Sequence, residues 1–457
     1  MNNTQSIDKI VSLCKSRGFV FPGSEIYGGL ANTWDYGPLG VELKNNIKRE
    51  WWKFFVTESE NSVGIDGGIL LNPRVWKASG HVDGFSDPLM DCKACKTRHR
   101  ADKLIESASK GTVNADNKPN EWLEKWINDN HVKCPNCGKS DWTPIRQFSL
   151  MFKTSRGVVD GSGDTVYLRP ETAQNQFIDF LPVQRAMRLK IPFGIGQIGK
   201  AFRNEITPGN FTFRTIEFEQ MEHQQFCREA ESMHFYKFYK DRAMDFYTRI
   251  LGLNKKNLQF KDHENLAHYA KAACDVEYRF PWGFGEIAGT HHRGTHDLGS
   301  HTRESGKAQE YLDPNTNEKF IPTVVESSHG CDRIILAAIC DAYHEDITGG
   351  ETRVVLKLAP RIAPYKAAVL PLQKKEQGPA AENIYRDLIK HFPCTYDESA
   401  SIGKRYRRAD EVGTPFCITV DFDTEKDQSV TVRARDTMLQ ERVKISELKE
   451  YINVRIL

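Results

Sequence analysis

Arginine and glutamate residues alternate with aromatic residues in one short stretch of this sequence. It runs from 198 to 223 and reads IGKAFRNEITPGNFTFRTIEFEQMEH. Arg203 and Arg214 carry planar guanidinium groups, which donate paired hydrogen bonds to phosphate. A carboxylate such as that of Glu205 accepts a hydrogen bond from an exocyclic amine, and Phe218 offers a ring on which a base stacks. These residue types together indicate a nucleotide site.

We interpret this stretch as a β-hairpin. Two runs of mixed apolar and charged residues, 198–206 and 211–220, flank Thr207-Pro208-Gly209-Asn210, and Pro, Gly and Asn suit a tight reversal of the chain. A simpler interpretation is a solvated sheet face on which Arg and Glu pair across the strands. Each such pair contributes roughly 0.2 to 1 kcal/mol. The stretch alone leaves both interpretations open.

A second segment places an arginine at the start of a helix. Residues 324–333 read VVESSHGCDR and lead into the apolar run IILAAICDAY. We therefore expect a strand through Gly330 and a helix that carries Arg333 in its first turn. Amide groups at a helix start and a neighbouring guanidinium both attract an anion.

A glycine-rich segment and a possible pocket carboxylate lie on either side of the hairpin. Glycines at 283, 285 and 289 surround Glu286, so the backbone there approaches a ligand closely or forms a bulged strand. The histidines that follow match no compact metal-ligand set. In Arg169-Pro170-Glu171, Glu171 stands at the mouth of a pocket or simply begins a helix.

Four cysteines have the spacing of a zinc site. Cys92 and Cys95 form one CxxC pair, and Cys134 and Cys137 form another. Two such pairs fit a tetrahedral zinc site with four thiolate ligands. The alternative is a vestigial pair of knuckles without metal. The polar, turn-rich residues between the pairs predict an inserted module that is too small to fold without the metal.

Several helices and strands must position these groups. Leu39, Leu43, Ile47, Trp51 and Phe55 recur every four residues and predict an amphipathic helix. A short apolar strand is expected at 69–71, ending at Pro73. Core packing or a subunit contact would explain both elements.

The last hundred residues predict a separate α/β domain. Strand-like segments at 366–372, 416–421 and 429–433 alternate with helical ones. The basic run from Lys404 to Arg408 includes Tyr406, which suits a phosphate backbone and an unstacked base. A solvated helix face would explain the run equally.

Composition is that of an ordinary globular protein. The chain has 457 residues, about three domains at roughly 150 residues each. Its net charge of +2 means that a polyanion must be met by local patches. The first residues, MNNTQSIDKI, lack a signal-peptide pattern, and no apolar run approaches the ~18 residues of a membrane span. We expect a cytoplasmic protein with reduced cysteines.

These motifs, taken together, resemble the class II aminoacyl-tRNA synthetases. Phe202 to Glu205 with Arg214 to Phe218 is similar to motif 2 of that class, Gly330 to Arg333 is similar to motif 3, and the stretch to Pro73 is similar to motif 1. More narrowly, WDYGPLG, LRPETAQ, GKAFRNEITP, FEQME and RADKLIE resemble the homodimeric glycyl-tRNA synthetases, over nearly the whole chain.

The resemblance implies an α+β fold: the class II antiparallel sheet flanked by helices, a zinc-knuckle insertion and a C-terminal α/β anticodon-binding domain. The expected domains are 1–355, with the insertion at about 86–145, and 356–457. Two departures stand out: Glu326-Ser327-Ser328 replaces a frequent Glu-Pro-Ser, and VRARD replaces a more usual VRDRD.

The resemblance also implies the reaction, in which glycine and ATP give glycyl-adenylate and pyrophosphate, and glycine then passes to the 3′ end of tRNA(Gly). Arg203, Glu205 and Arg333 would be the catalytic residues. Arg203 would hold the α-phosphate, Glu205 the adenine amine and Phe218 the base, with Mg²⁺ bridging the phosphates and Arg214 and Arg333 at the γ-phosphate. The full ATP set would be Arg203, Asn204, Glu205, Phe213, Arg214, Thr215, Ile216, Glu217, Phe218, Glu286, Ile287, Gly330, Cys331, Asp332 and Arg333.

Glycine has no side chain to hold, so the family's site must grip its ammonium and carboxylate and fill the space of a Cβ. Excluding a methyl group sterically is easier than rejecting a smaller substrate, and no editing domain is expected. The implied set is Arg100, Glu171, Phe218, Glu219, Gln220, Met221, Glu222, Glu326, Ser327, Ser328, His329 and Gly330. The alternatives are a non-catalytic relative that binds nucleic acid and a class II synthetase for another amino acid.

Overall fold

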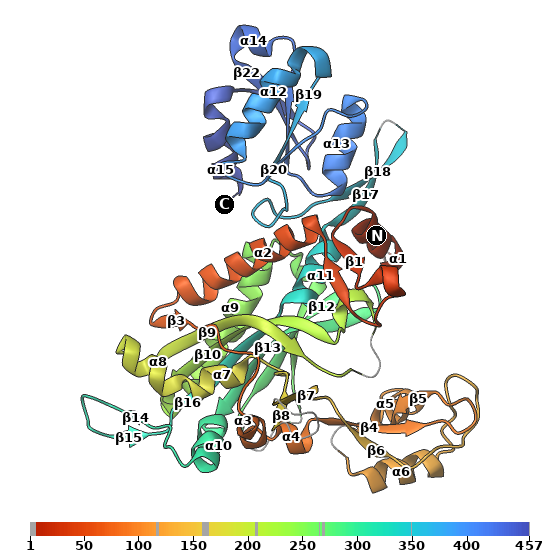
Figure 1. Cartoon of the computed structure of the whole chain (residues 1–457), viewed down its shortest axis with the longest axis vertical. Helices are drawn as coiled ribbons and strands as arrows, with labels where there is room; N and C mark the ends of the chain where they lie inside the picture. The colour runs from red at the N-terminus through yellow and green to blue at the C-terminus, as the bar shows by residue number, and fades with distance from the viewer. Residues whose placement is uncertain are drawn as a thin grey trace.

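The computed structural model describes residues 6–115, 118–157, 164–205, 209–264, 266, 270–348 and 350–456. It contains a central sheet with helices, a small module to one side and a C-terminal unit at the far end of the long axis (Figure 1). Among the helices within these ranges, none is long and apolar enough to cross a membrane.

The central sheet has seven strands and is antiparallel except at one edge, where β3 runs parallel to β9. This confirms the predicted antiparallel sheet. In spatial order the strands are β11 (Leu258–Asp262), β12 (Ala273–Phe280), β13 (Gly283–Gly294), β16 (Thr323–Gly330), β10 (Glu217–Cys227), β9 (Phe193–Phe202) and β3 (Ser62–Gly64).

Helices cover the two faces of this sheet unequally. One face packs against α2 (Pro38–Trp52), α9 (Glu229–Asp245) and α11 (Cys331–Ala342) in the largest apolar core. Toward Phe193 and Phe226, the other face is covered by α7 (Ala173–Ile178), α8 (Phe180–Met187) and α10 (His296–Ser305). Its opposite end, where β9 ends and β10 begins, is left for the site.

The predicted hairpin is confirmed, but its strands end earlier than expected. Phe202 of β9 pairs with Glu217 of β10, so residues 203–205 and 209–216 lie outside the two strands, in the loop between them. Phe211–Phe213 make a 3₁₀ turn inside this loop, after Asn210 at φ +57°. Residues 206–208, which include Thr207 and Pro208 of the predicted turn, lie outside the described part of the chain. The charged residues Arg203, Glu205 and Arg214 therefore belong to the loop and not to a sheet face.

The predicted helix over 39–55 is confirmed as α2, which continues as a wider turn over Lys53–Thr57. The strand predicted at 69–71 is wrong, because only Leu70 forms an isolated bridge, to Leu168. Just before Leu70, the side chains of Arg169 and Asn175 donate hydrogen bonds to the carbonyls of Gly67 and Gly68, respectively. Pro73 instead begins α3 (Pro73–Ala78).

The expected strand-to-helix change at Gly330 is confirmed, since β16 ends at Gly330 and α11 begins at Cys331. The backbone turns directly from one element into the other. Arg333 therefore lies in the first turn of α11, as predicted.

The module at the lower right of Figure 1 has its own apolar core. Its three strands lie in the order β5-β4-β6. Two helices pack beside them. The elements are β4 (Ser86–Asp91), β5 (Arg98–Arg100), α5 (Ala101–Ala108), α6 (Asn120–Asp129) and β6 (Arg146–Ser149).

The C-terminal unit is a five-stranded sheet with helices and its own core, which confirms the predicted α/β pattern. In spatial order its strands are β20 (Cys394–Tyr396), β19 (Ala367–Pro371), β21 (Phe416–Val420), β22 (Ser429–Ala434) and β23 (Gln440–Lys444), and its main helices are α12 (Lys374–Leu388), α13 (Ile402–Glu411) and α15 (Leu448–Ile456).

The basic run from Lys404 to Arg408 lies on α13, and two of its arginines bind other residues of the C-terminal unit. Arg405 is buried and donates to the carbonyl of Pro371 at 2.5 Å. Arg408 pairs with Asp397 at 2.6 Å.

A short linker, residues 359–366, joins the two large units. The buried ammonium of Lys366 donates to the carbonyls of Pro360, Arg361 and Ala363 at 2.6–3.0 Å. The amide of Asn46, on α2, donates to Ala363 at 3.0 Å and to Ile362 at 3.3 Å. The linker is therefore tied to α2.

Candidate active site

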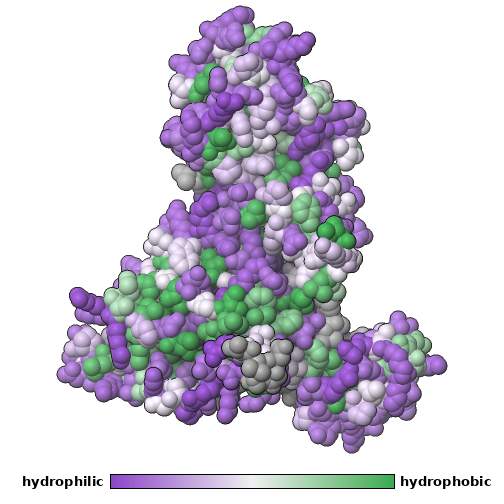
Figure 2. Space-filling view, viewed as in Figure 1, coloured by the Kyte–Doolittle hydropathy of each residue, from purple (hydrophilic) through white to green (hydrophobic). Residues whose placement is uncertain are grey.

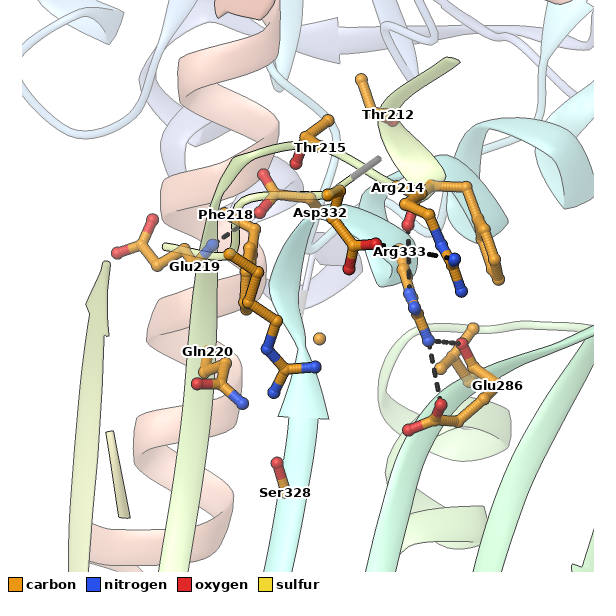
Figure 3. A pocket seen from close by; sticks show the side chains of 15 residues that line it. Thr212, Arg214, Thr215, Phe218, Glu219, Gln220, Glu286, Ser328, Asp332 and Arg333 are labelled. Atoms are coloured by element: carbon orange, nitrogen blue, oxygen red, sulfur yellow. Dashed lines mark hydrogen bonds and ion pairs between the residues drawn. The ribbon is translucent and has the colours of Figure 1, made fainter. Parts of the chain in front are cut away.

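A pocket opens at the uncovered end of the central sheet, between the loop after β9 and the start of α11 (Figure 3). Its walls come from β10, β13, β16, α11 and that loop. They are Arg203, Glu205, Thr212, Phe213, Arg214, Thr215, Phe218, Glu219, Gln220, Glu286, Ile287, Ser328, Gly330, Asp332 and Arg333.

Arg333 is fixed on one wall of the pocket. Its Nη1 donates to the carboxylate of Glu286 at 3.1 Å and to the Glu286 carbonyl at 2.9 Å (Figure 3). Its Nε donates to the carbonyl of Phe213, and the guanidinium lies 4.3 Å from the centre of the Phe213 ring. Partial desolvation at the pocket wall raises the pKa of Glu286, but Arg333 and His291 bring it below its ordinary value.

Arg203 lies on the opposite wall, with its guanidinium 5.3 Å from the ring centres of both Phe85 and Phe218. Its Nε donates to the carbonyl of Pro170 at 3.1 Å. Among the side chains that the structure describes, no carboxylate forms an ion pair with Arg203. Arg203 is thus held by two aromatic rings and a carbonyl. Because these groups do not neutralise its positive charge, the guanidinium can bind an anion.

Arg214 and Glu205 meet across the loop, with Nη1 and Oε2 3.6 Å apart. Four other residues of the expected ATP set, Asn204, Ile216, Glu217 and Cys331, are not among those that line the pocket. Thr215, Ile287 and Asp332 line it, but their side chains have further contacts outside it. The Asn204 amide N–H donates to Leu150, Ile216 contacts the carbonyl of Asn32, and Thr215 bonds the carbonyl of Glu217. The side chains of Ile287 and Cys331 belong to the apolar core, and the carboxylate of Asp332 turns toward Tyr36 and Lys44.

Below the pocket, the residues of β10 that were expected to bind glycine point alternately to the two faces of the sheet. Phe218, Gln220 and Glu222 point to the site, opposite Gly330 and Ser328 of β16. Met221 belongs to the core on the other face. On that face the Glu219 carboxylate pairs with Lys44 and Lys48 of α2. His329 is hydrogen-bonded to the hydroxyls of Tyr247 at 2.6 Å and Ser327 at 2.9 Å. Consecutive residues of FEQME therefore do not all reach one ligand.

Glu222 is the most unusual carboxylate of the site. It is 3% exposed and accepts hydrogen bonds from Thr172 at 2.5 Å, Ser328 at 2.8 Å and Gln220 at 3.1 Å. Among the described side chains, no cation pairs with it. Burial raises its pKa to about 8, and the nearby Glu326 adds to this effect.

The neighbouring carboxylates are compensated. Glu326 accepts from Arg293 at 3.1 Å, from His291 at 3.0 Å and from Gln224 at 2.8 Å. Burial would raise the pKa of Glu326, but Arg293 and His291 bring it to about 2. Glu171 lies 3.5 Å from His81. Burial would raise the pKa of Glu171, but the interaction with His81 outweighs this and lowers it well below its usual range. A cation bound among these acids would find Glu222 without a partner.

Arg100 is not brought to this pocket. It lies over a neighbouring cavity beside the inserted module, where it pairs with Asp102 at 2.6 Å and with Asp87 at 3.0 Å.

Five contacting residues were not in the expected site set: Thr172, Gln224, Arg293, His81 and His291. Gln224 continues the alternation of Gln220 and Glu222, so the period of β10 could have identified it. Thr172 directly follows Glu171 in the LRPETAQ motif. The partnership of Arg293 with Glu326 is set by strand pairing and had no local signal.

The four cysteines of the inserted module converge. Their sulfur atoms all lie within 4.8 Å of one another. Cys92 and Cys137 are 3.6 Å apart, and Cys95 and Cys134 are 3.7 Å apart. A tetrahedral zinc ion with Zn–S bonds of about 2.3 Å separates its sulfurs by about 3.8 Å. The donor set and its spacing therefore fit zinc.

Comparison with known proteins agrees with this architecture. An anticodon binding domain model matches residues 366–455. The crystal structure of prolyl-tRNA synthetase from Cryptosporidium parvum, complexed with halofuginone and AMPPNP, superposes with a TM-score of 0.61 at 13% identity, covering 100% of this chain and 76% of the other. This likeness shows a class II synthetase fold.

Curated relatives match along the whole chain. Glycine–tRNA ligase of Clostridium acetobutylicum is 56% identical over 463 residues, covering 100% of both chains. Glycine–tRNA ligase of Caldanaerobacter subterraneus subsp. tengcongensis is 56% identical over 456 residues, covering 99% of this chain and 98% of the relative. That of Geobacillus thermodenitrificans is 55% identical over 457 residues, with 99% and 98% covered. The chain therefore belongs to the glycine–tRNA ligase family.

Proposed function

We propose that this protein activates glycine with ATP, forming glycyl-adenylate and pyrophosphate, and then transfers the glycyl group to the 3′ end of tRNA(Gly). One observation carries the proposal. Strand β10 presents Phe218 to the arginine-lined pocket and, four residues on, the buried Glu222 to the acidic cluster. This arrangement supports a nucleotide subsite and an ammonium subsite along one strand, as joining the two substrates requires.

In the proposed complex, Arg203 holds the α-phosphate, Phe218 stacks on the adenine and Glu205 accepts from its amine. Arg214 and Arg333 bind the γ-phosphate. The fixed position of Arg333 beside Glu286 and the stacking of Arg203 on aromatic rings support these roles, because both guanidinium groups are already oriented in the free protein.

Adenylate formation is an in-line displacement at phosphorus. A glycine carboxylate oxygen forms a bond to the α-phosphorus, and the bond from that phosphorus to the bridging oxygen breaks to release pyrophosphate. Positioning and charge stabilisation supply the catalysis, so no protein nucleophile is needed. In the second step a hydroxyl of the terminal tRNA ribose takes the glycyl group, and AMP leaves.

The acidic cluster is proposed to select glycine. Glu171, Glu222 and Glu326 surround the ammonium position, and Ser328 borders both subsites. Thr172, Gln220 and Ser328 all donate to Glu222 and thereby hold its carboxylate in place.

Two metal ions complete the proposal. Glu286 supplies an exposed carboxylate of the kind Mg²⁺ accepts, and Mg²⁺ bound to ATP neutralises part of the phosphate charge. Cys92, Cys95, Cys134 and Cys137 would hold a structural Zn²⁺, which would stabilise the fold of the inserted module.

The remaining parts of the chain are assigned to tRNA and to a partner subunit. We assign residues 1–355 to catalysis, about 86–145 to the insertion and 356–457 to anticodon binding, in a cytoplasmic homodimer. A largely apolar groove runs along β3 and α8, lined by Trp52, Val56, Val63, Pro182, Val183 and Met187. Apolar surface gathers on this side of the molecule in Figure 2, which supports a subunit contact there.

The test is ATP–pyrophosphate exchange with single amino acids. We expect exchange with glycine and none with serine, threonine, proline, histidine or alanine. Exchange with one of the others would identify a different synthetase. No exchange with any of them would favour a non-catalytic relative.

A further inference from the structure

The back of the nucleotide pocket contains a buried charged cluster with no role in the proposed chemistry. It consists of Lys44 on α2, Glu219 on β10, Asp332 on α11 and Tyr36 on β2 (Trp34–Tyr36). Lys44, Glu219 and Asp332 are each less than 10% exposed. Three parts of the chain that are distant in sequence, residues 34–52, β10 and the start of α11, therefore meet at one point.

Lys44 is the centre of this cluster. Its Nζ lies 2.9 Å from the Glu219 carboxylate and 3.1 Å from the Asp332 carboxylate. Nζ also lies 4.5 Å from the centre of the Tyr36 ring. Burial lowers the pKa of Lys44, but the two carboxylates raise it above its ordinary value, so Lys44 is charged.

Asp332 joins the other members. One carboxylate oxygen accepts from the Tyr36 hydroxyl at 2.6 Å. The other accepts from the backbone N–H of Glu219 at 2.7 Å, and Figure 3 shows Asp332 beside Glu219. The Asp332 side chain, at the start of α11, is thus hydrogen-bonded to the backbone of β10 at the end of the strand that lines the pocket.

The neighbours of Glu219 and Asp332 line the pocket. Phe218 precedes Glu219, and Arg333 follows Asp332. Adjacent residues of a strand point to opposite faces, so holding Glu219 from behind fixes Phe218 in front. Holding Asp332 likewise fixes the turn of α11 from which Arg333 extends.

We propose that Lys44 is a positioning residue, which sets the separation between Phe218 and Arg333 and thereby the affinity for ATP, without touching the nucleotide. The inference rests on the proposed function for the identity of the nucleotide. The geometry that carries it is the double contact of Lys44 with Glu219 and Asp332.

The test is binding of a non-hydrolysable ATP analogue to the full chain by calorimetry, which needs no amino acid and no turnover. Lys44→Met should weaken binding at least tenfold, and Lys44→Arg should restore it to within about threefold of the unaltered protein. Lys48→Met is the matched control, because Lys48 contacts Glu219 at 2.7 Å but is more exposed and does not form an ion pair with Asp332. It should bind the analogue within about threefold.

Exchange kinetics provide the second measurement. Lys44→Met should raise the KM for ATP at least tenfold while changing the KM for glycine less than about twofold. A general loss of structure would affect both. Unchanged analogue affinity in Lys44→Met, or an equal loss in Lys48→Met, would overturn the proposal.

A milder variant covers the case in which Lys44→Met does not fold. Tyr36→Phe removes only the hydroxyl that donates to Asp332 and should weaken analogue binding about threefold. Wild-type affinity in that variant would then overturn the proposal. If the unaltered protein binds the analogue but shows no glycine-dependent exchange, the proposed function fails while the positioning role stands.

Discussion

The hydroxyl of Ser328 lies 2.8 Å from the carboxylate of Glu222, which is buried and has no cationic partner among the described side chains. The pKa of Glu222 is about 8, so Glu222 is mostly protonated at pH 7. An ammonium group favours the ionised form. Glycine binding at pH 7 is therefore expected to release close to one proton, and glycine affinity should rise as the pH approaches 8. Calorimetry in buffers of different ionisation enthalpy measures this release.

Glu222→Gln is the control, because it has no proton to lose. It should bind glycine more weakly and release no proton. Proton release that is absent in the unaltered protein, or unchanged in Glu222→Gln, would contradict the role given to Glu222.

The same group predicts a pH dependence of stability without ligand. The pKa of Glu222 is raised to about 8 in the folded state, whereas in the unfolded chain it has the ordinary value of about 4.3. Between these values the folded state binds the extra proton, so the free energy of unfolding falls by about 1.4 kcal/mol per pH unit as the pH rises. Thermal unfolding of Glu222→Gln should lack this slope, and parallel slopes for both proteins would refute it.

Arg203→Ala should lower glycine-dependent exchange by roughly 10² to 10³-fold, the usual cost of removing one oriented donor to a transition state. Arg203 is only partly buried, although it packs on Phe85 and Phe218, so the Tm should change little and tRNA binding should persist. Lys200→Ala is a suitable control, since Lys200 is half exposed and pairs with Glu217 at the surface. Full exchange activity in Arg203→Ala would exclude it from catalysis.

Zinc analysis tests the cysteine cluster. We expect one zinc per chain in the unaltered protein and a much lower content in Cys134→Ser, because Cys134 lies 3.7 Å from Cys95 in the cluster. Chelation should unfold the module that contains α5 and α6, which proteolysis would detect. Cys394→Ser is a control outside the cluster, and a preparation free of metal would favour vestigial knuckles.

The C-terminal unit offers a stability test. Arg433 forms a paired contact with Asp410 at 2.9 and 3.0 Å, and both are almost fully buried. Arg433→Met leaves Asp410 without this partner and should cost about 3 to 5 kcal/mol. Adding Asp410→Asn should recover part of that loss. Exchange should survive in both variants while tRNA charging falls, and a loss below about 1 kcal/mol would contradict the expectation.

Local sequence signals predicted some elements accurately. The apolar run after Gly330 and the four-residue period before Phe55 both correspond to helices of the structure. The parallel strand β3 was missed because it has only three residues, Ser62–Gly64, too few for a pattern. The strand predicted at 69–71 failed because distant side chains bind the backbone beside it.

The site was predicted in composition more than in arrangement. Motif resemblance identified Glu219, Glu222 and Arg100 together. Only Glu222 lies in the acidic cluster, because strand alternation turns Glu219 away and Asp87 and Asp102 hold Arg100 elsewhere. Such outcomes depend on which charged groups meet in three dimensions.

Helix α2 is attached on two sides. Lys44 joins it to the back of the pocket, and Asn46, two residues further on, joins it to the carbonyls of Ile362 and Ala363 in the linker. A 15-residue helix is stiff and about 22 Å long. A movement of the C-terminal unit that displaces the linker must therefore either break the Asn46 hydrogen bonds or rotate α2. Rotation of α2 would move Lys44 and, through it, the residues behind the nucleotide pocket.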